Sequence, residues 1–124
     1  MTSSKRILII EDNEASMHLM RAHLEKAGYQ TLSVQNGSEG LRAARSEKPD
    51  LIILDLLLPD IDGQKLCYMI KFDKNLEHIP VAIWTSRDAE DIADQTKTCG
   101  ANAFIPKTTR MPVVLDIIRR LLSE

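Results

Sequence analysis

Four short runs of apolar residues punctuate the chain, at residues 7–10, 51–54, 81–84 and 103–105. Each run is apolar throughout and does not alternate with polar residues, a pattern typical of strands buried on both faces of a parallel sheet. A fifth candidate, residues 31–34, follows Gly28 and contains polar residues, so we expect it at a more exposed edge of the sheet.

The segments between these strands carry helical signals. Asn13 can cap a first helix that buries Met17, Met20 and Leu24 and stops at Gly28. Further helices are predicted at residues 38–48, 63–73, 88–98 and about 110–122. Strand and helix thus alternate five times, which predicts an α/β fold. We expect a doubly wound, five-stranded parallel sheet in the flavodoxin-like order 2-1-3-4-5, with five helices on its two faces.

Composition narrows the class of protein. The 124 residues suffice for a single domain, residues 1–124, with a core at about 5–122. A formal charge of −2 argues against direct nucleic-acid binding, and no apolar run approaches the roughly 20 residues that span a membrane. Cys67 and Cys99 match no zinc spacing and read as buried thiols. These features predict a cytoplasmic globular domain.

Polar residues stand at the carboxyl end of each buried strand. Since the carboxyl ends of parallel strands meet at one edge of the sheet, their side chains are expected to gather there, near the change in strand order. The residues concerned are Glu11, Asp12, Asp55, Thr85, Ser86 and Lys107.

The carboxylates at this edge need a cation. Neighbouring strands lie about 4.8 Å apart, which would place Asp12 opposite Asp55 with Glu11 alongside. Each close pair repels by about 4 kcal/mol at 4 Å and an effective dielectric of 20. Hard oxygen ligands that form no full cage favour Mg²⁺, or Mn²⁺.

Two further groups can reach Asp55. Thr85 ends the next strand, and Lys107 lies two strand spacings away, about 9.6 Å, within reach of a long side chain. A hydroxyl, an ammonium and a metal ion converging on one carboxylate favour phosphoryl transfer, which requires mainly positioning and charge neutralisation. A carboxylate can itself act as the nucleophile.

This constellation resembles the receiver domain of bacterial two-component response regulators over essentially the whole chain. The resemblance rests on five motifs in order: the acidic pair after the first strand, the phosphoacceptor strand with its following loop, the hydroxyl with its small neighbour, the aromatic residue and the lysine. In this sequence they are Glu11-Asp12, Asp55 with Pro59 and Gly63, Thr85-Ser86, Phe104 and Lys107.

The resemblance implies a mechanism for a signalling switch. Glu11, Asp12, Asp55 and the backbone carbonyl of Leu57 would hold Mg²⁺. Asp55 would take a phosphoryl group from a histidine kinase, a histidine phosphotransfer protein or a small phosphodonor. Lys107 would pair with the phosphate. The chain would catalyse only its own phosphorylation and the hydrolysis of that phosphate, so it would not be an enzyme in the usual sense.

The same resemblance implies how the signal leaves the site. Thr85 would hydrogen-bond the phosphate, and Phe104 would turn inward behind it. The face made by the fourth helix, the fifth strand and the last helix would change shape and bind a downstream protein target. Leu57, Ser86 and Arg87 flank the site. Of these, Leu57 and Arg87 would set the rate of dephosphorylation, with Arg87 slowing hydrolysis through its charge. Excess apolar residues on the last helix favour a surface for a partner protein or for a homodimer.

One position departs from the family pattern. The family follows its lysine with a proline whose peptide bond is cis, whereas Thr108 follows Lys107 here. A cis bond before a residue other than proline costs about 3 kcal/mol. We therefore expect a trans bond, or a visibly strained one, and a changed direction for the lysine side chain.

Other functions stay open at this stage. A pseudo-receiver would keep the fold and signal without phosphorylation, as a protein-interaction module. A Toprim-like metal-dependent enzyme would need an Asp-x-Asp pair at a strand end, but Asp60 and Asp62 lie beyond Pro59. A haloacid-type phosphatase would need an aspartate at Leu57. The position of Glu124 favours a stand-alone receiver, although a fragment of a longer regulator would look the same.

Overall fold

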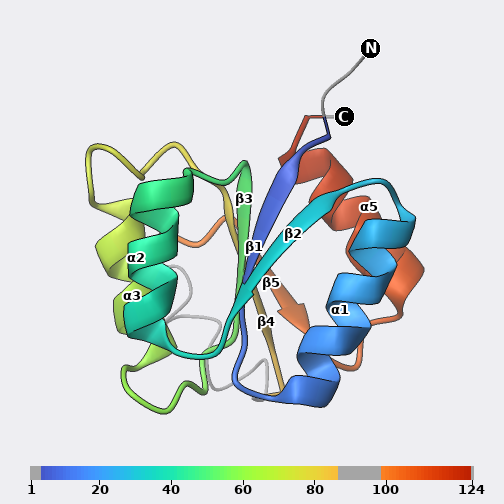
Figure 1. Ribbon diagram of the computed structural model, residues 1–124, viewed down its shortest axis with the longest axis horizontal. Coiled ribbons are helices and arrows are strands. Elements are labelled where there is room, and N and C mark those ends of the chain that lie inside the picture. Colours follow the sequence, from blue (N-terminus) through green and yellow to red (C-terminus); the bar gives the residue numbers. More distant parts are fainter. Residues whose placement is uncertain (1–3, 87–98, 124) are drawn as a thin grey trace.

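The chain folds around a five-stranded parallel sheet (Figure 1), in a computed structural model that describes residues 4–86 and 99–123. The strand order is β2-β1-β3-β4-β5, which confirms the predicted doubly wound topology. The strands are β1 (Arg6–Ile10), β2 (Gln30–Val34), β3 (Leu51–Leu54), β4 (Val81–Thr85) and β5 (Ala103–Pro106).

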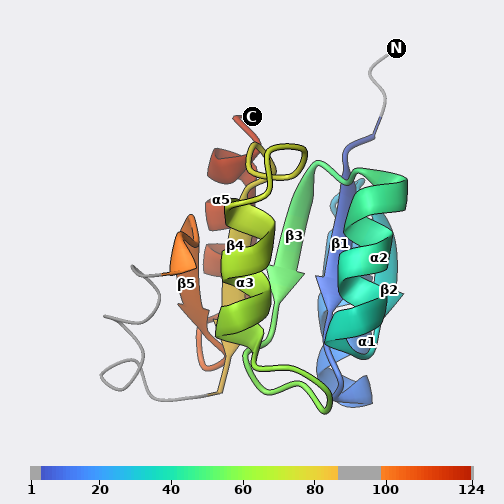
Figure 2. The same ribbon diagram turned by 90° about the vertical axis from the view of Figure 1, so that its left-hand side faces the viewer.

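Helices cover both faces of the sheet, so the molecule has three layers (Figures 1 and 2). On one face lie α1 (Glu14–Lys26) and α5 (Met111–Leu121), and on the other lie α2 (Gly37–Glu47) and α3 (Gly63–Lys71). The fourth predicted helix, residues 88–98, lies outside the described residues. Among those that are described, no helix has the length and apolar character needed to cross a bilayer.

The sheet divides the apolar core in two. Side chains alternate along β1, so that Leu8 and Ile10 pack toward α2 and α3, whereas Ile7 and Ile9 pack toward α1 and α5. All four are fully buried. The uninterrupted apolar runs therefore have the expected cause, since both faces of the central strands are covered. The edge strand β2 is only half-buried along most of its length, as predicted.

The loop from β3 to α3 returns closely past the end of β3. Asp62 caps α3, its side chain accepting a hydrogen bond from the amide of Gln64 at 2.9 Å. The amide of Gly63 donates to the carbonyl of Leu56 at 3.1 Å. A Cβ atom at residue 63 would clash with Leu56 Cα and would lie 2.6 Å from the carbonyl oxygen of Asp55. Glycine is required here because backbone, not side chain, occupies the space.

We expect Gly63→Ala to lower the free energy of unfolding by about 1–3 kcal/mol, the usual cost of overpacking. The obstructing atoms belong to the backbone around Asp55, which can give way only by moving that residue. Urea denaturation measures the change. Gly40→Ala is the matched control. The three atoms nearest to its added methyl group belong to the side chain of Ile10, which can shift more easily than backbone, so this change should cost less. Equal stability of Gly63→Ala and the native chain would contradict this account.

The same loop also binds the start of α2. The carboxylate of Asp60 accepts hydrogen bonds from the amides of Gly37, at 2.7 Å, and Ser38, at 2.9 Å. These two backbone bonds hold the pKa of Asp60 below its ordinary value. The N-terminus of α2 adds a favourable dipole for the charge.

This contact predicts a pH dependence. A carboxylate whose pKa is lowered by folding stabilises the native state above its unfolded pKa, and that contribution disappears as pH falls through the folded pKa. We therefore expect Asp60→Ala to be less stable than the native chain at neutral pH, with the difference shrinking in acid. Thermal unfolding of both proteins across the acid range measures it. A difference that is constant with pH would exclude the charged contact as its source.

Candidate functional site

A cleft of about 360 Å³ opens at the carboxyl ends of the strands. Polar residues from the ends of β1, β3, β4 and β5 meet there with the first turn of α1. Its lining consists of Glu11, Asp12, Asn13, Ser16, Asp55, Leu57, Ser86 and Lys107. Residues from separate parts of the sequence are therefore brought together at the edge of the sheet where α/β proteins place their sites.

The sheet hydrogen bonds position two carboxylates in the cleft. The amide of Glu11 donates to the carbonyl of Val34 at 3.0 Å, and that of Asp55 donates to the carbonyl of Ile10 at 3.0 Å. Each residue thus extends its strand by one step. Glu11 is 1% exposed and Asp55 is 4% exposed. Asp12 is exposed on the rim of the same cleft, so Glu11 is the buried member of the acidic pair.

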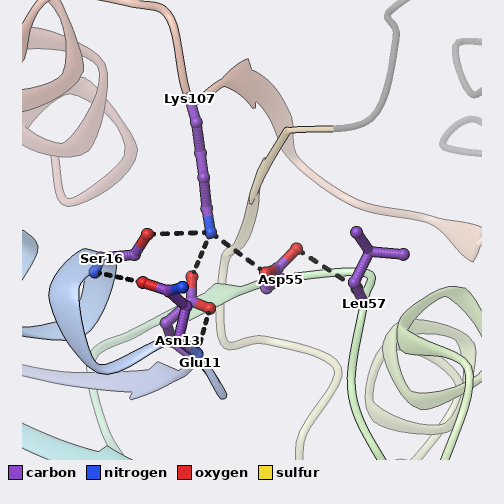
Figure 3. A network of polar contacts seen from close by, with 6 residues as sticks. All are labelled: Glu11, Asn13, Ser16, Asp55, Leu57 and Lys107. Atoms are coloured by element: carbon purple, nitrogen blue, oxygen red, sulfur yellow. Dashed lines mark hydrogen bonds and ion pairs between the residues drawn. The ribbon is translucent and has the colours of Figure 1, made fainter.

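Lys107 joins the two buried carboxylates (Figure 3). Its Nζ lies 2.8 Å from Oε1 of Glu11 and 3.2 Å from Oδ2 of Asp55. A further hydrogen bond of 3.2 Å links Nζ to the hydroxyl of Ser16 on α1. The described residues contain no cis peptide bond, so the bond to Thr108 is trans. The lysine side chain crosses the sheet edge to Asp55 without the family's cis proline.

The charge of Glu11 depends on its neighbours. Burial raises its pKa to about 6, while the contact with Lys107 and the hydrogen bond from the amide of Asn13 act in the opposite direction. That amide donates to Oε2 at 3.0 Å. Asp55 receives a weaker backbone bond, 3.2 Å from the amide of Leu57 to Oδ1. A cation in the cleft therefore favours the ionised form of Glu11.

The donors in the cleft suit a hard divalent cation. Glu11, Asp12 and Asp55 supply carboxylate oxygens, and Leu57 can add its carbonyl. None of the described lining residues carries sulfur or imidazole. Within the described part of the chain, no three acidic, histidine or cysteine side chains already form a metal-binding group. Lys107 supplies the positive charge between Glu11 and Asp55. The residues thus fit Mg²⁺ in chemical type.

The other predicted residues lie around this centre. Thr85 ends β4 and is fully buried, whereas Ser86 is exposed on the cleft. Leu57 is 53% exposed at the mouth. Phe104 on β5 is half-buried and packs into the core on the side of α2 and α3. Arg87 lies outside the described residues.

Two contacts of Lys107 were not predicted from the sequence. One is Ser16, and the other is Trp84, whose ring centroid lies 5.0 Å from Nζ. A weak signal for Ser16 existed, because the first turn of a helix capped by Asn13 must begin beside the end of β1. No such signal existed for Trp84, because a tryptophan in an apolar strand indicates a core residue.

Comparison with known proteins identifies a family. The model of the response regulator receiver domain matches residues 7–119. The polar-differentiation response regulator DivK of Brucella anthropi is 35% identical over 120 residues, covering 97% of this chain and 98% of that protein.

Solved structures agree with this match. The signal receiver domain of a signal transduction histidine kinase from Syntrophus aciditrophicus superposes with a TM-score of 0.90 at 38% identity, covering 97% of this chain and 91% of that one. The receiver domain of the sensor histidine kinase PA1611 from Pseudomonas aeruginosa has a TM-score of 0.90 at 24% identity, covering 98% and 100%. Its similarity concerns the fold, and that structure holds a magnesium ion in its active-site cleft.

Proposed function

This chain belongs to the response regulator receiver family, and from that premise we propose that it is a phosphorylation switch whose acceptor is Asp55. The observation that carries the proposal is the contact of Lys107 Nζ with Asp55 Oδ2, 3.2 Å, inside a cleft that holds a second buried carboxylate, Glu11. An ammonium held beside one carboxylate oxygen is placed to neutralise a phosphoryl group formed there. The other oxygen, Oδ1, is bonded only by the amide of Leu57 among the described contacts.

The reaction is a transfer to a carboxylate oxygen. A bond forms between an oxygen of Asp55 and the phosphorus atom. The bond that breaks joins phosphorus to nitrogen in a phosphohistidine, or to oxygen in a small acyl phosphate. The donor keeps the electron pair of the broken bond. We propose a histidine kinase or a histidine phosphotransfer protein as the natural donor, and water reverses the modification by hydrolysis.

We propose that Mg²⁺, or Mn²⁺, is held in the phosphorylated switch by Glu11, Asp12, Asp55 and the carbonyl of Leu57. The bound ion would supply positive charge to the phosphoryl oxygens. The magnesium in the cleft of the Pseudomonas receiver supports this assignment, as does the oxygen-only donor set here. Lys107 contributes the remaining fixed positive charge, and Ser16 and the sheet backbone orient it.

The proposed output signal starts from Thr85. Its hydroxyl would hydrogen-bond the phosphoryl group, and Phe104 would follow by packing inward. The change in Thr85 and Phe104 is a population shift between two states, and the phosphoryl group is the ligand that favours one of them. The predicted face of the fourth helix, β5 and α5 would then bind a downstream protein, or a second copy of the chain; the fourth helix, residues 88–98, lies outside the described residues. The rate of hydrolysis would be set by Leu57 and Arg87, two of the residues that flank the site.

The domain organisation, the compartment and the class of partner that we propose follow from the same features. We propose a single receiver domain over residues 1–124 that catalyses only its own phosphorylation and dephosphorylation. Cys67 and Cys99 are both buried free thiols, which suits the reducing cytoplasm. The formal charge of −2 supports protein partners over nucleic acid.

The test is the intact mass of the protein after incubation with acetyl phosphate, with Mg²⁺ and with a chelator. We expect one added phosphoryl group with Mg²⁺, removed by hydroxylamine as an acyl phosphate should be, and none with the chelator. No added mass, from acetyl phosphate or from a panel of phosphorylated histidine phosphotransfer proteins, would reject the proposal and favour a pseudo-receiver.

A further inference from the structure

Trp84 is an unusual occupant of its strand position. It is the one tryptophan of the chain, it is 2% exposed, and it lies next to last in β4. Its Nε1 is buried and has no hydrogen-bond partner among the described residues. Burying an unsatisfied donor is unfavourable, and a purely apolar side chain would avoid it. The packing of the core therefore does not by itself account for an indole here.

The ring has a specific polar neighbour. The ammonium of Lys107 lies over it, 5.0 Å from the ring centroid. This is within the range of a cation–π interaction, for which tryptophan offers the strongest aromatic face. The lysine side chain is only 16% exposed. Water therefore screens this attraction less than it would at an open surface.

The fold holds this pair in register. Trp84 is paired with Ile105 in the β4–β5 ladder, and both side chains face α1 and α5. The amide of Lys107 donates to the carbonyl of Thr85 at 2.9 Å. The backbone of the lysine is thus fixed one step beyond the tryptophan, but the four methylene groups of its side chain remain rotatable. Only contacts at the far end can fix the ammonium.

Those contacts divide into two kinds. Glu11 and Asp55 carry the charges that the proposed reaction alters or uses. The ring of Trp84 and the hydroxyl of Ser16 take no part in that chemistry, so they can hold Nζ in either state of the switch. They approach the ammonium from β4 and from α1 respectively.

We infer that Trp84 is a positioning residue for Lys107, its ring face holding the ammonium at the phosphoryl site together with the hydroxyl of Ser16. The inference rests on the proposed function, because it assigns Trp84 to the same reaction. It also explains how the lysine reaches Asp55 although Thr108 replaces the proline of the family pattern and the bond before it is trans.

The test compares Trp84→Phe, which keeps an aromatic face and loses the N–H, with Trp84→Leu, which keeps apolar bulk and loses the face. We expect the initial rate of phosphorylation by acetyl phosphate and Mg²⁺ to fall roughly 3- to 10-fold in Trp84→Leu. Trp84→Phe should stay within about twofold of the native rate. Circular dichroism and thermal unfolding verify that both variants are folded.

A spectroscopic reading is independent of phosphorylation. In the unphosphorylated native protein, the ring current of Trp84 should shift the Hε protons of Lys107 upfield, and Trp84→Leu should abolish that shift. An unshifted lysine in the native protein would overturn the inference, and so would a native rate in Trp84→Leu, or equal slowing in both variants. If the native protein takes up no phosphoryl group, the proposed function fails. The shift of the Lys107 Hε protons is measured without phosphorylation, so it tests the inference separately.

Discussion

Asp55→Asn is expected to take up no phosphoryl group under conditions that fully phosphorylate the native chain. An amide has no anionic oxygen to attack phosphorus, so the loss should be complete within the detection of intact mass spectrometry. The fold should survive. The amide oxygen of asparagine can still accept the bond from Leu57, and the change removes one of two nearly buried negative charges beside Lys107.

A matched control stands at the other end of the same strand. Asp50 precedes β3, and its Oδ2 accepts a hydrogen bond from the amide of Arg6 at 2.8 Å. Asp50→Asn keeps an acceptor there and makes the same chemical change far from the cleft. It should be phosphorylated like the native protein. Phosphorylation of Asp55→Asn would move the acceptor to another carboxylate and contradict the assignment.

Lys107→Met is expected to slow phosphorylation about 100-fold, the usual effect of removing one preorganised group that stabilises developing charge. Methionine matches the length of the lysine stem but carries no charge and no N–H donor. Lys65→Met on α3 is the control, because Lys65 is an exposed lysine outside the cleft. Initial rates with acetyl phosphate at saturating Mg²⁺ measure both. A native rate in Lys107→Met would remove the lysine from the mechanism.

The same variant should also be less stable when divalent cations are absent. Without the ammonium, Glu11 and Asp55 face each other across the cleft with no shared positive charge. We expect the free energy of unfolding in EDTA to fall by about 1–3 kcal/mol, less than for a fully buried pair because Lys107 is partly exposed. Mg²⁺ should recover more stability in this variant than in the native chain. Equal recovery in both would show that the ion binds elsewhere.

The fold was predictable because its cause is local and repeated. Residues 7–10 and 51–54 are apolar at every position, which only a strand covered on both faces requires. Helix ends were predicted to within one or two residues where a cap exists, as at Asn13, whose side chain accepts from the amide of Ser16. The last helix begins at Met111, one residue from the predicted start at about 110, although its cap residue Arg110 makes no side-chain hydrogen bond.

The site was predictable only as a set of strand ends. Topology brings Glu11, Asp55 and Lys107 to one edge, but it does not state which member of the acidic pair turns inward. Nor could sequence show that Asp60 binds the start of α2, since that contact joins residues 23 positions apart across two loops. The ring of Trp84 under the lysine is a contact of the same kind, set by side-chain direction and not by periodicity.

The sheet also acts as a partition between two kinds of work. Trp84 lies on the side of α1 and α5, and Phe104 lies on the side of α2 and α3, although the two come from neighbouring strands. The ring that holds Lys107 and the aromatic residue of the proposed relay thus lie on opposite sides of the sheet, although the proposed output face also includes α5, on the side of Trp84. Replacing Phe104 should therefore alter the proposed relay while leaving the contact between the Trp84 ring and Lys107 in place. The hold on Lys107 and the movement of Phe104 can therefore change separately during evolution.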